Sequence, residues 1–330
     1  MATDYAIDIQ NVAKTYKGLF KAGVPALRGI DMQVHRGEVF GLLGPNGAGK
    51  STLVKILMTV IRASRCSGTM LGKPIGDKAA LQRVGYLPEH HSFPPYLTGT
   101  QLIEFFGAMS NVNRRDRKRR ASELLELVGM GDWGNKKLGS YSKGMRQRVG
   151  IAQSLINDPD LVLLDEPTDG VDPVGRRDIR RILEHLRDEG KTVLVNSHIL
   201  SELEQVSSRV AILVQGAVAK QGTIEELTSG QERYEIELDS QSAPILQSYA
   251  GQKIANHAVE IEGSRLLISS DDPAQIQPII DSIRSKNGTI LAIKRTRPSL
   301  EDLFMQAVTD PETGETLAPG AAKMSKKGGA

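Results

Sequence analysis

The sequence has one cysteine, Cys66, among 330 residues. A single thiol excludes an internal disulfide framework and any metal site built from several cysteines, and it suits a reducing cytosol. The charges nearly cancel, because 42 basic and 39 acidic side chains leave a formal net charge of +3. So small an excess produces no overall field that would attract nucleic acid.

Long hydrophobic runs are also missing. The longest, such as 210–214, have the length of a strand, and the N-terminus lacks the basic and apolar stretches of a signal peptide. We therefore expect a protein that does not enter or cross a membrane by itself. At 330 residues, the chain is long enough for one large α/β domain and a smaller second one.

Strand-like and helix-like segments alternate over residues 1–230. The pattern predicts strands at 7–12, 31–34, 39–43, 83–87, 161–165, 192–196 and 209–215, and helices at 99–109, 114–128, 144–157, 173–189 and 200–206. Such alternation is typical of a layered α/β domain.

A second, α+β domain is predicted at residues 231–309. The order of its segments is β-α-β-β-α-β, which is ferredoxin-like: strands at 233–238, 258–262, 265–269 and 289–294, and helices at 243–250 and 273–285. Ser299 is expected to cap a final helix that reaches Val308. Residues 310–330 lack periodicity and predict a disordered tail.

A glycine-rich loop stands between the apolar run 39–43 and a helical run at 52–58. Glycines at this spacing let backbone N–H groups point at phosphate oxygens, and the following helix adds its positive end. Lys50 would contact the outer phosphates, and the Ser51 hydroxyl would bind Mg²⁺. The loop predicts a nucleoside triphosphate site made by Gly44, Pro45, Asn46, Gly47, Ala48, Gly49, Lys50, Ser51 and Thr52.

Two adjacent carboxylates, Asp165 and Glu166, end the apolar run 161–165. At the two-residue period of a strand they would point in different directions. Asp165 could then hold Mg²⁺ while Glu166 acts as general base toward the attacking water. The alternative is an acidic pair that only caps a loop.

The segment 138–148 opens a predicted helix and resembles the signature segment of ATP-binding cassette (ABC) ATPases. The family's Leu-Ser-Gly-Gly-Gln stands here as Tyr141, Ser142, Lys143, Gly144 and Met145. Serine and the second glycine are kept, and the first glycine and the glutamine are lost. The resemblance implies that Ser142 and Gly144 form an anion site facing a phosphate held by another nucleotide-binding domain. Taken alone, the segment also fits an N-capped helix.

The resemblance covers roughly the first 230 residues. It implies that Tyr16 stacks on adenine, although a core tyrosine at a strand end is an alternative. It also implies that Asp172, in the loop 170–173, lies at a dimer interface with the nucleotide, and that His198 senses the γ-phosphate. Glu89 stands where the family typically has glutamine. Its carboxylate could approach Mg²⁺ or water and would add negative charge beside the triphosphate.

The resemblance implies an ATPase with ATP and Mg²⁺ as cofactors, and with Lys50, Glu166 and His198 as its catalytic residues. Its fold would be a layered α/β core with a helical subdomain. Two ATP-binding subunits, as a homodimer or a pseudo-dimer, would sandwich ATP and drive an integral membrane permease from the cytoplasmic face of the cell membrane. The branch of the family that the sequence resembles implies export. The alternative is a soluble ABC ATPase acting on nucleic acid, ribosomes or protein complexes. The net charge gives nucleic acid no support as a partner.

Two further features have simpler interpretations. The basic run 114–120 could touch anionic lipid, but a solvated helix face is the preferred interpretation. His90 and His91 are adjacent in a proline-rich loop and lack the spacing of a metal site.

Overall fold

A computed structural model describes residues 4–18, 21–229, 233–249, 253–254, 257–270 and 272–309, together with residues 313 and 316. The chain forms two units: the first runs to Thr223 and resumes at Ala307, and the second comprises Ile224–Gln306. The boundary expected at residue 230 and nearly all of the tail predicted at 310–330 lie outside the described residues.

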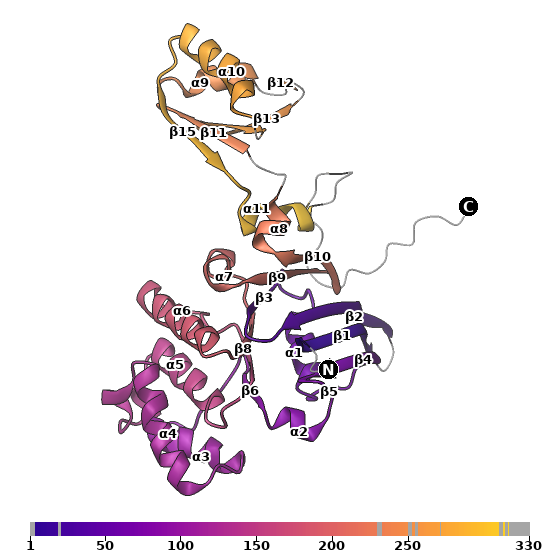
Figure 1. Ribbon diagram of the computed structural model, residues 1–330, viewed down its shortest axis with the longest axis vertical. Helices are drawn as coiled ribbons and strands as arrows, with labels where there is room; N and C mark the ends of the chain where they lie inside the picture. Colours follow the sequence, from indigo (N-terminus) through magenta and orange to yellow (C-terminus); the bar gives the residue numbers. More distant parts are fainter. Residues whose placement is uncertain are drawn as a thin grey trace, which may run out of the picture. The chain divides into compact units, whose positions relative to one another are not determined.

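A six-stranded sheet forms the centre of the first unit (Figure 1). The order is β10-β9-β3-β8-β7-β6, and neighbours are parallel except for β10 with β9. The bounds are β3 Val39–Leu43, β6 Val84–Leu87, β7 Leu161–Asp165, β8 Thr192–Asn196, β9 Arg209–Val214 and β10 Ala217–Thr223. Every residue of β3, β7 and β8 is buried, as in parallel strands covered on both faces.

A four-stranded antiparallel sheet lies beside it, in the order β2-β1-β4-β5. Its strands are β1 Tyr5–Gly18, β2 Lys21–His35, β4 Arg65–Met70 and β5 Lys73–Pro74. The strands predicted at 7–12 and 31–34 are therefore only parts of longer ones. Register shifts interrupt the two-residue period of β1, and Asn11 has a φ of 52°. This irregularity concealed the full strand from pattern analysis.

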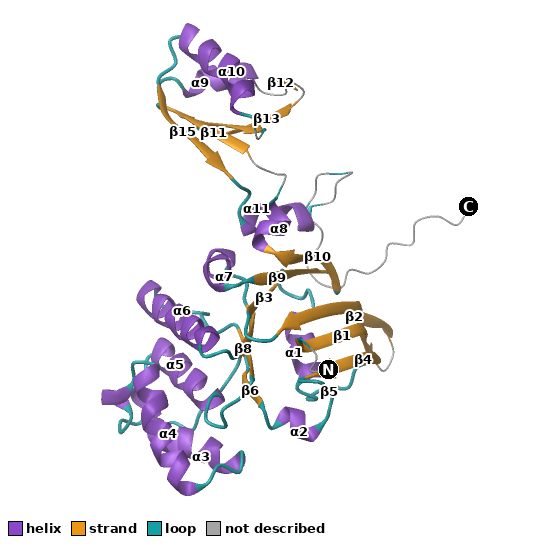
Figure 2. Ribbon diagram, viewed as in Figure 1, coloured by secondary structure: helices purple, strands orange, loops and turns teal. Residues whose placement is uncertain are grey.

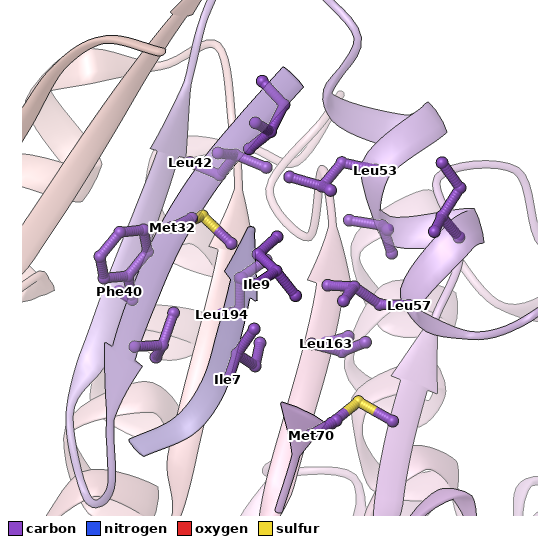
Figure 3. Close-up of a cluster of buried hydrophobic side chains, with 14 of the residues drawn as sticks. Ile7, Ile9, Met32, Phe40, Leu42, Leu53, Leu57, Met70, Leu163 and Leu194 are labelled. Carbon is purple, nitrogen blue, oxygen red and sulfur yellow. The ribbon is translucent and has the colours of Figure 1, made fainter. Parts of the chain in front are cut away.

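One apolar cluster joins both sheets to α1, Lys50–Leu57 (Figure 3). Burying each such side chain contributes about 1.5–3 kcal/mol. The cluster therefore holds the helix after the glycine-rich loop against the end of β3. The labelled members are Ile7, Ile9, Met32, Phe40, Leu42, Leu53, Leu57, Met70, Leu163 and Leu194.

The five longer helices that follow α2, Lys78–Leu81, agree closely with the predicted ones, whereas α2 and two 3-10 turns were not predicted. The five are α3 Gly99–Met109, α4 Arg114–Leu127, α5 Lys143–Ser154, α6 Pro173–Asp188 and α7 Leu200–Val206, and the short 3-10 turns are η1 Gly131–Trp133 and η2 Leu138–Ser140. Side-chain caps from Thr98, Asn113, Ser142 and Asp172 set the starts of α3 to α6. α3, α4 and α5 pack on one another as a helical subdomain (Figure 2). The layered α/β core with a helical subdomain is thus confirmed.

The second unit contains a five-stranded antiparallel sheet in the order β12-β13-β14-β11-β15. Its elements are α8 Ile224–Thr228, β11 Arg233–Leu238, α9 Ala243–Leu246, η3 Gln247–Tyr249, β12 Lys253–Ile254, β13 His257–Glu262, β14 Arg265–Ser269, α10 Pro273–Ser285 and β15 Ile290–Thr296. α11 Leu300–Val308 follows, and its last two residues belong to the first unit. The predicted β-α-β-β-α-β order is confirmed, with the two-residue β12 as an addition. Ser299 accepts the amide of Asp302, as a helix cap does.

Candidate active site

The glycine-rich loop joins β3 to α1 and lines a pocket of about 320 Å³. Gly49 has a φ of 109°, and a Cβ there would lie 2.6 Å from Leu27 Cδ2 and 2.7 Å from the Ala26 oxygen, so only glycine fits. Two acidic residues remote in sequence, Glu89 and Glu166, also line the pocket. The full lining is Ala26, Asn46, Gly47, Gly49, Lys50, Ser51, Thr52, Glu89 and Glu166.

The Lys50 side chain is 5% exposed, and its amine donates to the Gly44 oxygen at 2.6 Å and to the Pro45 oxygen at 3.4 Å. Burial lowers the pKa of Lys50, and the nearby carboxylates of Glu166, Asp165 and Glu89 oppose that change. A buried ammonium group needs anionic partners, and triphosphate oxygens are suitable ones.

Ser51 and Asn196 meet at Asp165, which is 1% exposed. Ser51 Oγ donates to Asp165 Oδ1 at 3.3 Å, and the Asn196 amide donates to the same oxygen. Burial raises the pKa of Asp165, whereas these two hydrogen bonds lower it. A hydroxyl beside a carboxylate is a donor set of hard oxygens, which fits Mg²⁺ held jointly with nucleotide phosphates.

Glu166 pairs with His198. Its Oε2 lies 2.7 Å from His198 Nδ1 and accepts the His198 backbone amide at 3.3 Å. Burial raises the pKa of Glu166, and the charge and hydrogen bond of His198 lower it. The histidine is about half exposed, and the glutamate is buried. The arrangement can orient a water and accept its proton.

Asp165 and Glu166 were expected to point in different directions as successive residues of one strand, and this reason is wrong. The regular strand β7 ends at Asp165, and Glu166 adopts a φ of 55°, in the left-handed region. The Glu166 amide donates to the Asn196 oxygen at 2.8 Å, which fixes this turn. The two carboxylates therefore diverge because the backbone turns between them.

Tyr16 and Glu89 are both accessible. Tyr16 is 44% exposed, so the alternative of a core tyrosine is wrong, and the Lys14 amine lies 5.1 Å from its ring centroid. Glu89 lines the pocket beside Lys50 and lies 3.9 Å from His90 Nε2.

The residues of the signature segment lie outside this pocket's lining. Ser142 is exposed and caps α5 by accepting the Met145 amide at 3.2 Å, which is the geometry of the alternative interpretation. Asp172 caps α6 in the same way, through the Gly175 amide at 2.7 Å. A Cβ on Gly144 would lie 3.3 Å from Val171, so the starts of α5 and α6 are neighbours.

Sequence reasoning missed two buried polar residues at the site. Asn196 is fully buried at the end of β8 and bonds Asp165, and Gln147 on α5 donates to the Glu166 oxygen at 3.2 Å. A polar residue at the end of an apolar strand was the available signal for Asn196. Gln147 carried no comparable signal, because its partner lies on another element.

Side chains of the basic run 114–120 and of the pair His90 and His91 contact other residues of this chain. In the basic run, Arg117 donates to the Val112 oxygen and Arg120 to the Leu155 oxygen. His91 packs on Phe93 with ring centroids 4.9 Å apart. Across the described ranges, no group of three or more His, Cys, Asp or Glu side chains could hold a metal ion. No helix in that part of the chain is long and apolar enough to span a bilayer.

Known proteins with similar sequences are ABC transporter ATP-binding proteins. Residues 27–169 match the family described as ABC transporter, and residues 222–308 match the C-terminal domain of ATP-binding proteins like DrrA1-3. An uncharacterized ABC transporter ATP-binding protein of Synechocystis is 41% identical over 92% of this chain and 85% of its own length. The daunorubicin resistance ATP-binding protein DrrA3 of Streptomyces coeruleorubidus is 33% identical over 93% of this chain and 97% of its own.

Solved structures agree. The dimeric post-hydrolysis state of the ATP-binding cassette MJ0796, bound to ADP and phosphate, matches with a TM-score of 0.60 and 26% identity. The match covers 66% of this chain and 98% of that one. A glycine-rich loop, a magnesium-compatible Ser51 and Asp165, and the Glu166 and His198 pair occur together in this fold. The chain therefore belongs to the ATP-binding proteins of ABC transporters, and it is an ATPase that uses ATP and Mg²⁺.

Proposed function

We propose that this chain is the energy-supplying subunit of an exporter and works as a homodimer bound to a separate membrane permease at the cytoplasmic face of the cell membrane. The observation that carries the energy-supplying part of the proposal is the contact of Glu166 with His198 beside the loop that holds Lys50. Two relatives are named as daunorubicin and linearmycin resistance proteins, which supports export as the direction. The dimeric state of the MJ0796 cassette supports the pairing of two copies.

Each residue of the pocket has a proposed part in ATP hydrolysis. The loop 44–52 and the amine of Lys50 bind the phosphates, and Ser51 and Asp165 hold Mg²⁺, with Glu89 beside them. Bound Mg²⁺ supplies charge neutralisation on the phosphates. Glu166 orients the attacking water and accepts its proton. His198 keeps that carboxylate in place and contacts the γ-phosphate.

The exposed starts of α5 and α6 suit an interface with the second copy. Ser142 and Gly144 present a hydroxyl and a backbone amide at a helix N-terminus, a place that favours anions. We assign them to the ATP of the partner subunit, with Asp172 beside them and Tyr16 on adenine. ATP would then hold the two copies together, and hydrolysis would release them.

A second cavity suits the permease. It has a volume of about 480 Å³, and its lining includes His91, Phe93 and Phe106, which follow Glu89 in the chain. Tyr96, Phe105 and Met109 add exposed apolar surface in the same segment. A hollow that combines polar and apolar side chains, with exposed apolar surface beside it, suits the reception of another protein's helix or loop. Residues 90–95 are loop, and α3 begins only at Gly99.

The first test is Glu166→Gln in the full-length chain. We expect ATP to bind with near-normal affinity, turnover to fall by about 100-fold or more, and a dimer to accumulate with ATP in size-exclusion chromatography. Lys50→Ala is the complementary variant, and it should weaken ATP binding itself. Unchanged hydrolysis in the Glu166 variant would reject the assignment.

The second test is an affinity pull-down from gently solubilised native membranes. Recovery of an integral membrane protein supports the transporter proposal, and the Lys50→Ala chain tests whether recovery depends on nucleotide. Recovery only with ribosomal or nucleic-acid partners in the soluble fraction would favour a soluble ABC ATPase.

A further inference from the structure

Lys143, the first residue of α5, forms an ion pair that leaves its own helix. Its Nζ lies 2.7 Å from Asp169 Oδ2, in the loop between β7 and α6. A positive charge in the first turn of a helix is unfavourable, because the backbone N–H groups there already carry partial positive charge. The stability of α5 alone therefore does not explain why a lysine stands at this position.

Gly170 makes room for this ion pair. Its φ is 64°, and a Cβ at this position would lie 2.2 Å from Lys143 Nζ and 2.8 Å from Lys143 Cδ. The lysine side chain thus lies directly across a glycine that also adopts the left-handed conformation. The same bond lowers the pKa of Asp169, since the Lys143 amine donates to its carboxylate.

Asp169 is in turn bonded to the backbone of Glu166. The Asp169 amide donates to the Glu166 oxygen at 3.2 Å, and Gln147, one turn further along α5, donates to the same oxygen at 3.2 Å. Glu166 has a φ of 55°, which a residue other than glycine keeps only when its surroundings fix it. Two contacts from α5, one direct and one through Asp169, therefore converge on this carbonyl.

We propose that Lys143 is a positioning residue for ATP hydrolysis, which fixes the backbone of Glu166 against α5 through Asp169. This inference rests on the proposed part of Glu166 as general base. The same turn of α5 carries Ser142, so the ion pair also connects the surface assigned to the partner's nucleotide with the carboxylate of this subunit's own site. Both members of the pair are more than half exposed, at 57% and 51%, and such pairs contribute little to folding.

The test is a double-mutant cycle on the full-length chain with Lys143→Met, Asp169→Asn and the double variant. We expect kcat for ATP hydrolysis to fall by about tenfold in each single variant, with KM for ATP and the melting temperature unchanged. The double variant should be no slower than either single one, because the two residues act as one unit. Lys143→Arg keeps the charge and should recover most of kcat.

Arg119→Met is the matched control. It breaks the exposed ion pair between Arg119 and Glu123, at 2.9 Å, in the same helical subdomain but on α4, and it should leave kcat unchanged. A normal kcat in Lys143→Met would overturn the inference. So would a slow Lys143→Met beside a normal Asp169→Asn, since the lysine would then act without Asp169. Failure of the proposed function is separate, because it appears as unchanged turnover in Glu166→Gln.

Discussion

At the scale of single residues, the active site depends on hydrogen bonds between buried polar groups. Asp165 and Asn196 are both at most 1% exposed, and each would be costly to bury without its partner. The Asn196 backbone oxygen also accepts the Glu166 amide. One asparagine thus supports both carboxylates.

Asn196→Ala should therefore lower both the stability of the fold and the apparent affinity for Mg²⁺. We expect the free energy of unfolding to fall by about 1–3 kcal/mol, because Asp165 loses a buried donor. The Mg²⁺ concentration needed for half-maximal ATPase activity should rise. Urea unfolding and a Mg²⁺ titration measure the two effects.

Asn157→Ala is the control for this prediction, since its amide donates to the Gln82 oxygen at 2.8 Å and not to the site. It should keep the wild-type response to Mg²⁺. If Asn196→Ala proves as stable and as active as the wild type, Asn196 does not support Asp165 in the way described.

At the scale of elements, helices were predictable where a cap stood in the sequence, and strands were predictable where they were buried. α3, which Thr98 caps, matches the expected bounds, and β3, β7 and β8 do as well. α7 also matches, although no side chain caps its start. β4 and β10 were missed because each has only one buried residue and carries mostly small or polar side chains. They are strands because they pair with β1 and β9. Such pairing cannot be recognised from neighbouring residues in the sequence.

An ion-pair cluster links three elements around Asp158. Its Oδ1 lies 2.8 Å from the Lys191 amine, just before β8, and 3.4 Å from Arg120 on α4. Asp158 itself follows α5 and has a φ of 56°, which asparagine also tolerates. The hydrogen bond from Lys191 is the main cause that lowers the pKa of Asp158 below its usual 3.8.

Asp158→Asn should therefore reduce stability in a pH-dependent way. A carboxylate with a lowered folded-state pKa contributes stability above its unfolded pKa, and that contribution is lost as pH falls through the folded value. At pH 7 the variant should lose less than about 1 kcal/mol, because Asp158 is well exposed. The difference from wild type should vanish only below the folded-state pKa of Asp158, which is lower than its usual 3.8.

Thermal unfolding across this pH range measures the effect. Asp188→Asn is a matched control, since Asp188 is similarly exposed and pairs with its neighbour Arg187. The control should cost less stability at pH 7, because Asp188 pairs with one cation and Asp158 with two. Equal stability of Asp158→Asn and wild type at pH 7 would contradict the prediction.

At the scale of the whole molecule, the two units have separate apolar cores. One core surrounds α1, and the other contains Ile236, Leu266 and Ile283. We expect two unfolding transitions in calorimetry, of which ATP with Mg²⁺ raises only the one that belongs to the nucleotide-binding unit.

Ile236→Ala assigns the other transition. Ile236 is fully buried, so its truncation should cost about 2–5 kcal/mol and lower the melting temperature of the second unit alone. The shift caused by ATP should remain as in the wild type. A single transition that both changes move would show that the units unfold together.

The sequence by itself determined that this chain binds and hydrolyses a nucleotide, because that information is local. The spacing of glycines before Lys50 and Ser51 sets a loop whose backbone can surround phosphates, and caps such as Thr98 set where helices start. These features need only neighbouring residues, so they can be recognised without a fold.

Only the tertiary structure decided how the catalytic groups meet. The parallel register of β7 with β8 sets Asp165 beside Asn196, and the turn after each strand brings Glu166 to His198, 32 residues away. The packing of α5 on the loop after β7 brings Lys143 to Asp169. Such pairings depend on strand register and helix packing, which are set by burial of the apolar core and not by residues adjacent in the chain.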